Sequence, residues 1–93
     1  MTQIIAIFEI ENMTVNQYES VEEELLSLGL SNPKGRIQHV AAPMQNGWYV
    51  TDIWESADHL DRFAKTLVPI LIKNNVKPAS PTVYKIHNKV DHN

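Results

Sequence analysis

The first strand-like segment of the chain places the strongest constraint on its fold. Residues 3–11 read QIIAIFEIE, and apolar side chains occupy both alternating sets of positions: Ile5 and Ile7 in one set, and Ile4, Ala6, Phe8 and Ile10 in the other. Successive side chains of a β-strand point to opposite faces of its sheet. We therefore expect a strand that is covered on both faces.

The next segment predicts a helix from about Val15 to Leu28. Thr14 precedes Gln17 by three residues, as in a capping box, and Gly29 offers a C-terminal stop. Four apolar residues follow at helical spacing and form a stripe for the core, namely Tyr18, Val21, Leu25 and Leu28.

A β-hairpin is expected after a loop at residues 29–35. Two runs rich in β-branched or aromatic residues, Arg36–Pro43 and Trp48–Glu55, flank the dipeptide Asn46-Gly47. This dipeptide favours a type I′ turn, in which both central residues have positive φ. The sequence therefore predicts two antiparallel strands joined by such a turn.

The second helix is expected to begin after Ser56, which is a good N-cap. Its apolar stripe consists of Leu60, Phe63, Ala64, Leu67, Ile70 and Leu71. Pro69 lacks a backbone donor and crowds the preceding turn, so we expect the helix to break or kink near Val68 and to restart as a short piece.

The remainder of the chain predicts a last strand and a tail. Residues 77–81, KPASP, read as a stiff connector, Thr82–Asn88 as a strand, and residues 89–93 as a polar tail. The complete order is strand, helix, strand, strand, helix, strand.

This order predicts an α+β, ferredoxin-like βαββαβ domain that spans residues 1–93. Four antiparallel strands form the sheet, and both helices lie on one face. Because the first strand is apolar on both sides, the simplest cover for the other face is a second copy of the chain. We expect a homodimer through this open face; the alternative is an uncovered, partly polar face.

Composition excludes several classes of function. The net charge is −3, and the eight Lys and Arg are scattered among eleven Asp and Glu, which disfavours a nucleic-acid partner. The absence of cysteine removes disulfides, thiolate nucleophiles and zinc-thiolate sites. No apolar run approaches the length of a membrane span, and the first ten residues lack the features of a signal peptide. We expect a cytoplasmic protein that does not contact a membrane.

The hairpin brings together the residues with the greatest chemical potential. A two-residue loop at Asn46-Gly47 would set His39 opposite Trp54, and a four-residue loop would set it opposite Asp52. Either register places these three side chains on one face, together with Trp48. An Asp near His39 would fix its tautomer and make it more basic, so His39 and Asp52 are the candidate catalytic residues. The alternative is a core histidine beside a surface carboxylate.

The other histidines carry weaker signals. His59 is expected in solvent at the start of the second helix, His92 in the tail, and His87 near the end of the last strand. None has the spacing of a metal site, and the chain has no glycine-rich phosphate loop and no nucleophile-elbow motif. We expect no metal and no cofactor.

Several segments resemble the antibiotic-biosynthesis monooxygenase-like branch of the dimeric α/β-barrel superfamily. They cover most of the chain and read HVAAP (39–43), NGW (46–48), VTDIWES (50–56), LVP (67–69) and IHN (86–88), with Phe63 in the second helix. The resemblance implies a dimeric α/β barrel, with Trp54 as a residue of the ligand pocket. Haem-degrading members have an Asn in the first strand and a His within the second helix region; here the first strand has no Asn and His59 lies at the very start of the helix.

The expected function is therefore a small-molecule-binding homodimer with Trp48, Trp54 and Phe63 as ligand-binding residues. One activity that the resemblance implies is cofactor-independent oxygenation of an electron-rich aromatic or polyketide-like substrate. The alternatives are a non-catalytic ligand-binding or stress-related dimer, and an interaction module whose pocket is filled by its own side chains.

Overall fold

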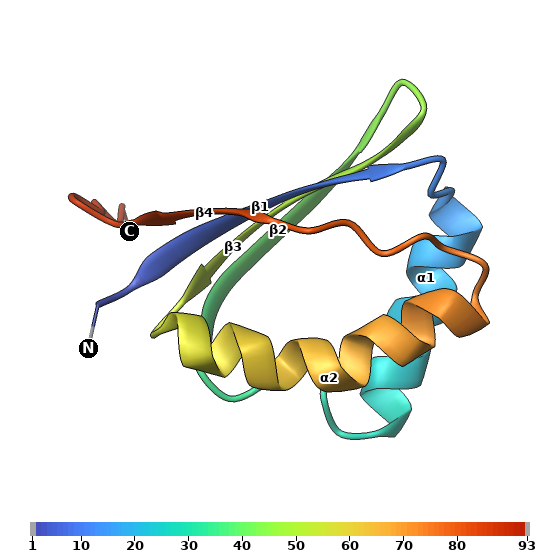
Figure 1. Cartoon of the computed structure of the whole chain (residues 1–93), viewed down its shortest axis with the longest axis horizontal. Helices are drawn as coiled ribbons and strands as arrows, with labels where there is room; N and C mark the ends of the chain where they lie inside the picture. The colour runs from blue at the N-terminus through green and yellow to red at the C-terminus, as the bar shows by residue number, and fades with distance from the viewer. Residues whose placement is uncertain (1, 93) are drawn as a thin grey trace.

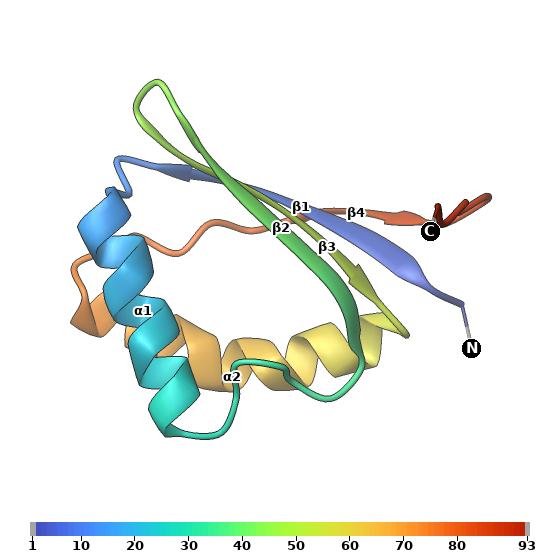
Figure 2. The same ribbon diagram turned by 180° about the vertical axis from the view of Figure 1, so that it is seen from behind.

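The computed structural model describes residues 2–92. Its elements are β1 (Ile4–Glu11), α1 (Val15–Ser27), β2 (Arg36–Met44), β3 (Gly47–Trp54), α2 (Ala57–Lys73) and β4 (Thr82–Lys85). The strands form one antiparallel sheet in the order β2-β3-β1-β4. Both helices lie on the same side of this sheet (Figures 1 and 2). The predicted ferredoxin-like βαββαβ fold is confirmed.

The N-terminal cap of α1 forms as its sequence predicts. The Thr14 hydroxyl accepts a hydrogen bond from the Gln17 backbone N–H at 3.1 Å, and the Gln17 side-chain oxygen accepts one from the Thr14 backbone N–H at 2.9 Å. These two bonds satisfy donors that a helix start leaves free. At the other end Gly29 has a φ of 74°, a conformation that glycine adopts without steric cost, and the chain leaves the helix there.

The β2–β3 hairpin is confirmed, but its turn differs from the prediction. His39 pairs with Asp52 and Met44 with Gly47, so the turn residues are Gln45 and Asn46. Asn46 does not have the positive φ that a type I′ turn requires, and that turn type was therefore wrong. Gly47 is instead the first residue of β3, where a Cβ atom would clash with the carbonyl oxygen of Ile10. The glycine permits a close approach to β1 rather than a turn.

Helix α2 passes through Pro69 without a break. It runs from Ala57 to Lys73 as one element, so the predicted break near Val68, with a restart as a short piece, was wrong. Pro69 is exposed, while Phe63, before it, and Ile70, after it, are buried. Burial of apolar side chains on both sides of the proline outweighs one lost backbone hydrogen bond.

The last strand is shorter than predicted. It covers Thr82–Lys85 rather than continuing to Asn88, and one further backbone bond joins Ile86 to Gln3 at 3.0 Å. Its partner strand explains the difference, because Lys85 already pairs with Ile4, the first residue of β1. Among residues 2–92, no strand lies beside the chain beyond Lys85.

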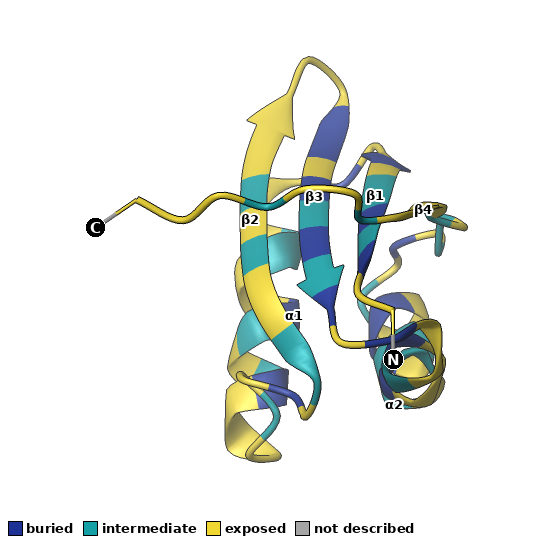
Figure 3. Cartoon of the chain, turned by 90° about the vertical axis from the view of Figure 1, so that its left-hand side faces the viewer, coloured by how far each residue is buried: buried dark blue, intermediate teal, exposed yellow. Residues whose placement is uncertain are grey.

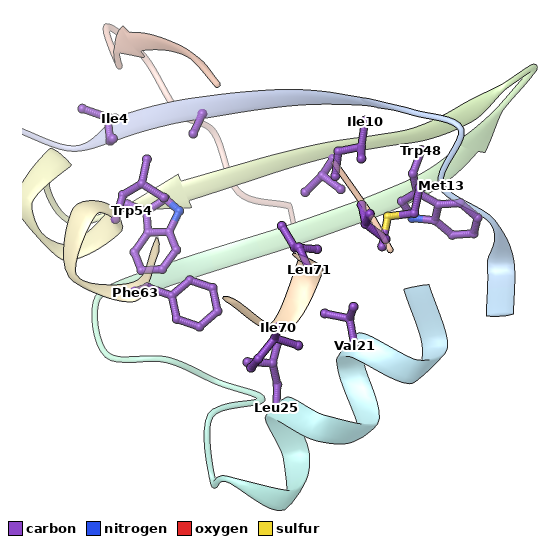
Figure 4. Close-up of a cluster of buried hydrophobic side chains, with 14 residues drawn as sticks. Ile4, Ile10, Met13, Val21, Leu25, Trp48, Trp54, Phe63, Ile70 and Leu71 are labelled. Carbon is purple, nitrogen blue, oxygen red and sulfur yellow. The ribbon is translucent and has the colours of Figure 1, made fainter. Parts of the chain in front are cut away.

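The core lies between the helices and the inner face of the sheet. Buried side chains come from β1, β3 and both helices, and Figure 4 shows Trp54 and Phe63 at one end of this cluster and Trp48 and Met13 at the other. Figure 3 shows that all residues of β2 are exposed or intermediate, while every second residue of β3 from Trp48 to Trp54 is buried, and these residues face inward. No helix among residues 2–92 is both long and apolar enough to cross a membrane.

The outer face of the sheet, opposite both helices (Figures 1 and 2), is largely apolar. Ile5 and Ile7 of β1 and Ile53 of β3 are only partly buried there, and Val40 of β2 is 52% exposed. Residues 85–89 lie beside Ile5 and Ile53 around a shallow hollow. The complete burial of both faces of β1 that we predicted from its sequence is therefore not achieved within one chain.

Candidate functional site

His39 and Asp52 form a close pair on the inner face of the sheet. They occupy directly opposed positions of β2 and β3, and Nδ1 of His39 lies 2.6 Å from Oδ1 of Asp52. Asp52 is only 4% exposed, and its second oxygen accepts a hydrogen bond from the indole N–H of Trp54 at 3.3 Å. A carboxylate can only accept, so Nδ1 carries the donated proton and Nε2 of the neutral ring is left as a base.

Tyr18 completes this network from helix α1. Its hydroxyl lies 2.8 Å from Nε2 of His39, and the carboxylate of Glu22, one turn further along α1, lies 3.7 Å from the same nitrogen. Burial, and then the charge of Glu22, raise the pKa of Tyr18 well above its ordinary value. The phenol therefore stays protonated and donates its hydrogen bond to His39 when the imidazole is neutral.

The spacing of apolar residues predicts Tyr18 as a core residue of α1 and does not indicate this polar role. The ring does fill the core, because it stacks on Trp48 with centroids 4.8 Å apart and planes 18° apart. The signal that was available is a single hydroxyl in a stripe that is otherwise aliphatic. A buried tyrosine hydroxyl usually finds a polar partner, and in this sheet the partner is His39.

A pocket of about 290 Å³ lies between the sheet, the two helices and the 78–81 connector. Its wall is mainly apolar, and its polar residues include His39 with three neighbours, Tyr18, Glu22 and Asp52. The volume is near the lower end of the range for small-molecule sites, which combine an apolar wall with a few polar groups. The pocket is open space, whereas the interaction-module alternative required one filled by the protein's own side chains.

The three predicted aromatic ligand-binding residues occupy different places. Phe63 lines the pocket, whereas Trp48 and Trp54 are not among the described residues that do so. Trp54 is fully buried behind the wall and packs against Phe63, with ring centroids 5.5 Å apart. Trp48 supports Tyr18 from behind, and its indole nitrogen is buried with no hydrogen-bond partner among residues 2–92. The two tryptophans thus hold the residues that face the cavity.

The remaining histidines lie away from the pocket. His59 bonds through Nδ1 to the Ser56 hydroxyl at 2.7 Å, at the start of α2, and His87 borders the shallow hollow on the outer face. His59 is more enclosed than predicted, with a side chain only 13% exposed. Within residues 2–92, no three His, Cys, Asp or Glu side chains are grouped so that they could hold a metal ion.

Comparison with known proteins gives similarity of structure but not of sequence. No family model matches the sequence, and no curated protein does. The fold, by contrast, matches solved structures along nearly its whole length. The cofactor-independent oxygenase SnoaB from Streptomyces nogalater superimposes with a TM-score of 0.68 at 10% identity, covering 99% of this chain and 100% of that one.

Two further solved structures have the same arrangement. A putative antibiotic biosynthesis monooxygenase from Chloroflexus aurantiacus gives a TM-score of 0.66 at 12% identity, with 97% of this chain and 98% of that chain covered. The heme-degrader MhuD from Mycobacterium tuberculosis gives 0.54 at 14% identity, with 95% and 99% covered. The chain thus has the fold of the antibiotic biosynthesis monooxygenase-like proteins, as its sequence motifs predicted.

Proposed function

We propose that this chain is a homodimeric, cofactor-independent monooxygenase that binds a small, electron-rich aromatic compound. The observation that carries the proposal is the His39–Asp52 pair in the wall of an apolar pocket. Such a pair can remove a proton from a phenol or from an activated C–H group, because Asp52 stabilises the imidazolium that forms. The apolar wall accommodates a flat ligand and keeps water away from the anion.

The proton transfer requires a small rearrangement of the network. Nε2 of His39 accepts the hydrogen bond of the Tyr18 hydroxyl when the pocket holds no ligand. A ligand that brings an acidic O–H or C–H to Nε2 takes the place of this hydroxyl. Tyr18 can then donate to Glu22 or to an oxygen atom of the ligand, so its hydroxyl has a hydrogen-bond acceptor both with and without the ligand.

The oxygenation step needs no group beyond the substrate and O2. The deprotonated substrate passes one electron to O2, and the resulting carbon radical and superoxide combine to a peroxide. Loss of water then leaves a carbonyl group. A methylene group and O2 thus become a carbonyl group and water, which balances atoms and electrons.

Two lines of support come from outside the pocket. A cofactor-independent oxygenase is among the structural neighbours, although low identity limits that likeness to the fold. The apolar outer face supports the dimer, since Ile5, Ile7 and Ile53 would be covered by the same face of a second copy. We keep the cytoplasmic location expected from the sequence as part of this proposal.

Oxygen uptake with a panel of anthrones and hydroquinones tests the activity. The protein, treated with a chelator, should consume O2 faster than buffer and faster than the same protein after heat inactivation. Conversion of anthrone to anthraquinone, followed by chromatography, should account for the oxygen consumed. No rate above buffer across the panel would contradict the proposed activity.

A second candidate is a dimer that binds the same class of ligand without converting it. The specific observation that favours it is that both ring nitrogens of His39 have partners, Asp52 and Tyr18, so that no strong base is free at the pocket surface. Saturable binding of anthrone without oxygen uptake or product would select this candidate over the oxygenase.

A further inference from the structure

A β-bulge at the start of β2 turns a charged side chain toward the pocket. His39 pairs with Asp52, and Gln38 with Ile53, but the register then shifts so that Arg36 pairs with Trp54. A regular strand would have placed Ile37 opposite Trp54, on the inner face. The bulge leaves Ile37 41% exposed and brings Arg36 inward in its place.

This exchange runs against the usual distribution of side chains. An isoleucine is normally buried and an arginine is normally exposed. The bulge reverses this, because it exposes Ile37 and places the charged Arg36 beside an apolar cavity. Bulges frequently re-aim side chains next to functional sites. The direction of this exchange therefore indicates a role for the charge of Arg36 in the pocket.

The guanidinium of Arg36 is held in position and retains free donors. One of its nitrogens donates to the Ser31 carbonyl oxygen at 2.8 Å, and its central carbon lies 5.8 Å from the centre of the Phe63 ring. Among residues 2–92, no carboxylate lies within ion-pair distance of it. By contrast, Arg62 on the exposed face of α2 pairs with Asp58 at 2.7 Å.

None of the described acidic side chains that line the pocket forms an ion pair with Arg36. Asp52 bonds to His39 and Trp54, Glu22 lies beside the far nitrogen of His39, and Asp61 is exposed at the rim. Arg36 is the only Lys or Arg among the described residues that line the cavity. A planar guanidinium with unused N–H groups binds carboxylate and other anionic oxygens through two hydrogen bonds.

We propose that Arg36 binds an anionic oxygen of the ligand, so that the pocket selects aromatic compounds that carry an acidic group such as a carboxylate. This inference rests on the proposed function, because it assigns the substrate class of the same pocket. The aromatic body lies on Phe63 and the apolar wall, the acidic oxygen faces Arg36, and the reacting group faces His39. Arg36 and His39 both point inward from β2, so one ligand can span them.

A matched pair of probes separates charge from shape. Naphthoate and naphthamide have nearly the same size, but only naphthoate carries a negative charge. Isothermal titration of the wild-type protein should give naphthoate an affinity at least about 10-fold higher than naphthamide, as one charge-assisted bidentate contact allows. Added salt should weaken the binding of naphthoate and leave that of naphthamide unchanged.

Two substitutions at Arg36 and one control identify the residue responsible. Arg36→Met keeps an apolar stem over Phe63 and should abolish the preference for naphthoate, with naphthamide affinity kept within about 3-fold. Arg36→Lys retains the positive charge but lacks the planar guanidinium that can donate two parallel hydrogen bonds, so it should keep only part of the preference for naphthoate. This second variant keeps the test valid if Arg36→Met folds poorly. Arg62→Met, remote from the pocket, should behave as wild type, with circular dichroism checking the fold of each variant.

The outcomes distinguish this inference from the function on which it rests. Equal binding of the two probes by the wild-type protein, or a preference that survives in Arg36→Met, would overturn the role of Arg36 while the ligand pocket stands. Binding of neither probe would overturn both the ligand pocket and the substrate class.

Discussion

Nδ1 of His39 lies 2.6 Å from Oδ1 of Asp52, across directly opposed residues of β2 and β3. This contact depends on the register of the hairpin, because a slip of one residue would move one of the two side chains to the outer face. It also orients the imidazole, since the buried carboxylate holds the proton on Nδ1 and directs Nε2 toward Tyr18 and the pocket.

Replacing the carboxylate should therefore impair the base without unfolding the chain. Asp52→Asn keeps the shape of the side chain but no longer holds the proton on Nδ1 of His39, and we expect the rate of oxygen uptake to fall about 100-fold or more. Asp61→Asn, at the exposed rim of the same pocket, is the control and should retain its rate. An Asp52→Asn variant that oxidises anthrone as fast as wild type would refute the role of the pair.

Tyr18 should make stability more sensitive to alkaline pH. Its pKa is raised in the folded protein, so the folded state holds the phenolic proton more tightly than the unfolded chain does. The stability contributed in this way is complete below the ordinary tyrosine pKa of about 10 and is lost as the pH rises above it. Urea unfolding at about pH 9 and about pH 11 should show a smaller loss for Tyr18→Phe than for wild type. Equal losses would contradict the assignment.

The two tryptophans should respond differently to the same substitution. Trp54 donates to Asp52, whereas the indole nitrogen of Trp48 is buried without a partner among the described residues. Trp54→Phe leaves a buried carboxylate oxygen without its donor, while Trp48→Phe removes an unsatisfied donor. In paired urea titrations, we expect the free energy of unfolding to be lower for Trp54→Phe than for Trp48→Phe by about 1–2 kcal/mol. A larger loss for Trp48→Phe would contradict this reading of the network.

The outer face of the sheet should mediate dimerisation. Ile7→Lys places a charge in the centre of the apolar surface and should weaken self-association at least about 10-fold. Leu26→Lys alters a residue that is 65% exposed on α1, away from that surface, and should leave the dimer intact. Sedimentation velocity distinguishes these results. A wild-type protein that sediments as a monomer at all concentrations would refute the interface.

The elements of this fold could be predicted because their signals are local. The capping box of Thr14 and Gln17 and the apolar stripes of both helices depend on neighbouring residues, and the structure contains them except at one position. Leu28, which we expected at the end of the first stripe, lies beyond the end of α1 and is 55% exposed. Alternation along β3 likewise placed Asp52 and Trp54 on the inner face. These predictions hold because local preference and tertiary packing point the same way.

The wrong predictions of the turn, the helix break and the end of the last strand concern positions where a tertiary contact determines the local structure. Gly47 serves the approach of β3 to β1 rather than the turn, and Pro69 stays within α2 because buried residues continue beyond it. The end of β4 is fixed by the start of its partner strand at Ile4. None of these contacts can be read from the residues beside the position concerned.

The candidate site was predictable only in part. Strand alternation along the hairpin predicts His39 and Asp52 on one face, and the structure makes them directly opposed. Tyr18 comes from a different element and Arg36 reaches the pocket through a bulge, so neither position follows from strand periodicity. Trp48 and Trp54 were on the predicted face but lie one layer behind the cavity wall.

Exchange of the acidic C–H protons of anthrone for deuterium, without O2, is the most direct test of His39 as the base. NMR in heavy water under nitrogen measures proton removal alone, separate from the oxygen step. We expect wild-type protein to accelerate the exchange over buffer, and we expect His39→Gln, with its fold intact, to lose this acceleration by about 100-fold. Exchange no faster than in buffer, or equally fast with His39→Gln, would contradict the assignment of His39 as the base.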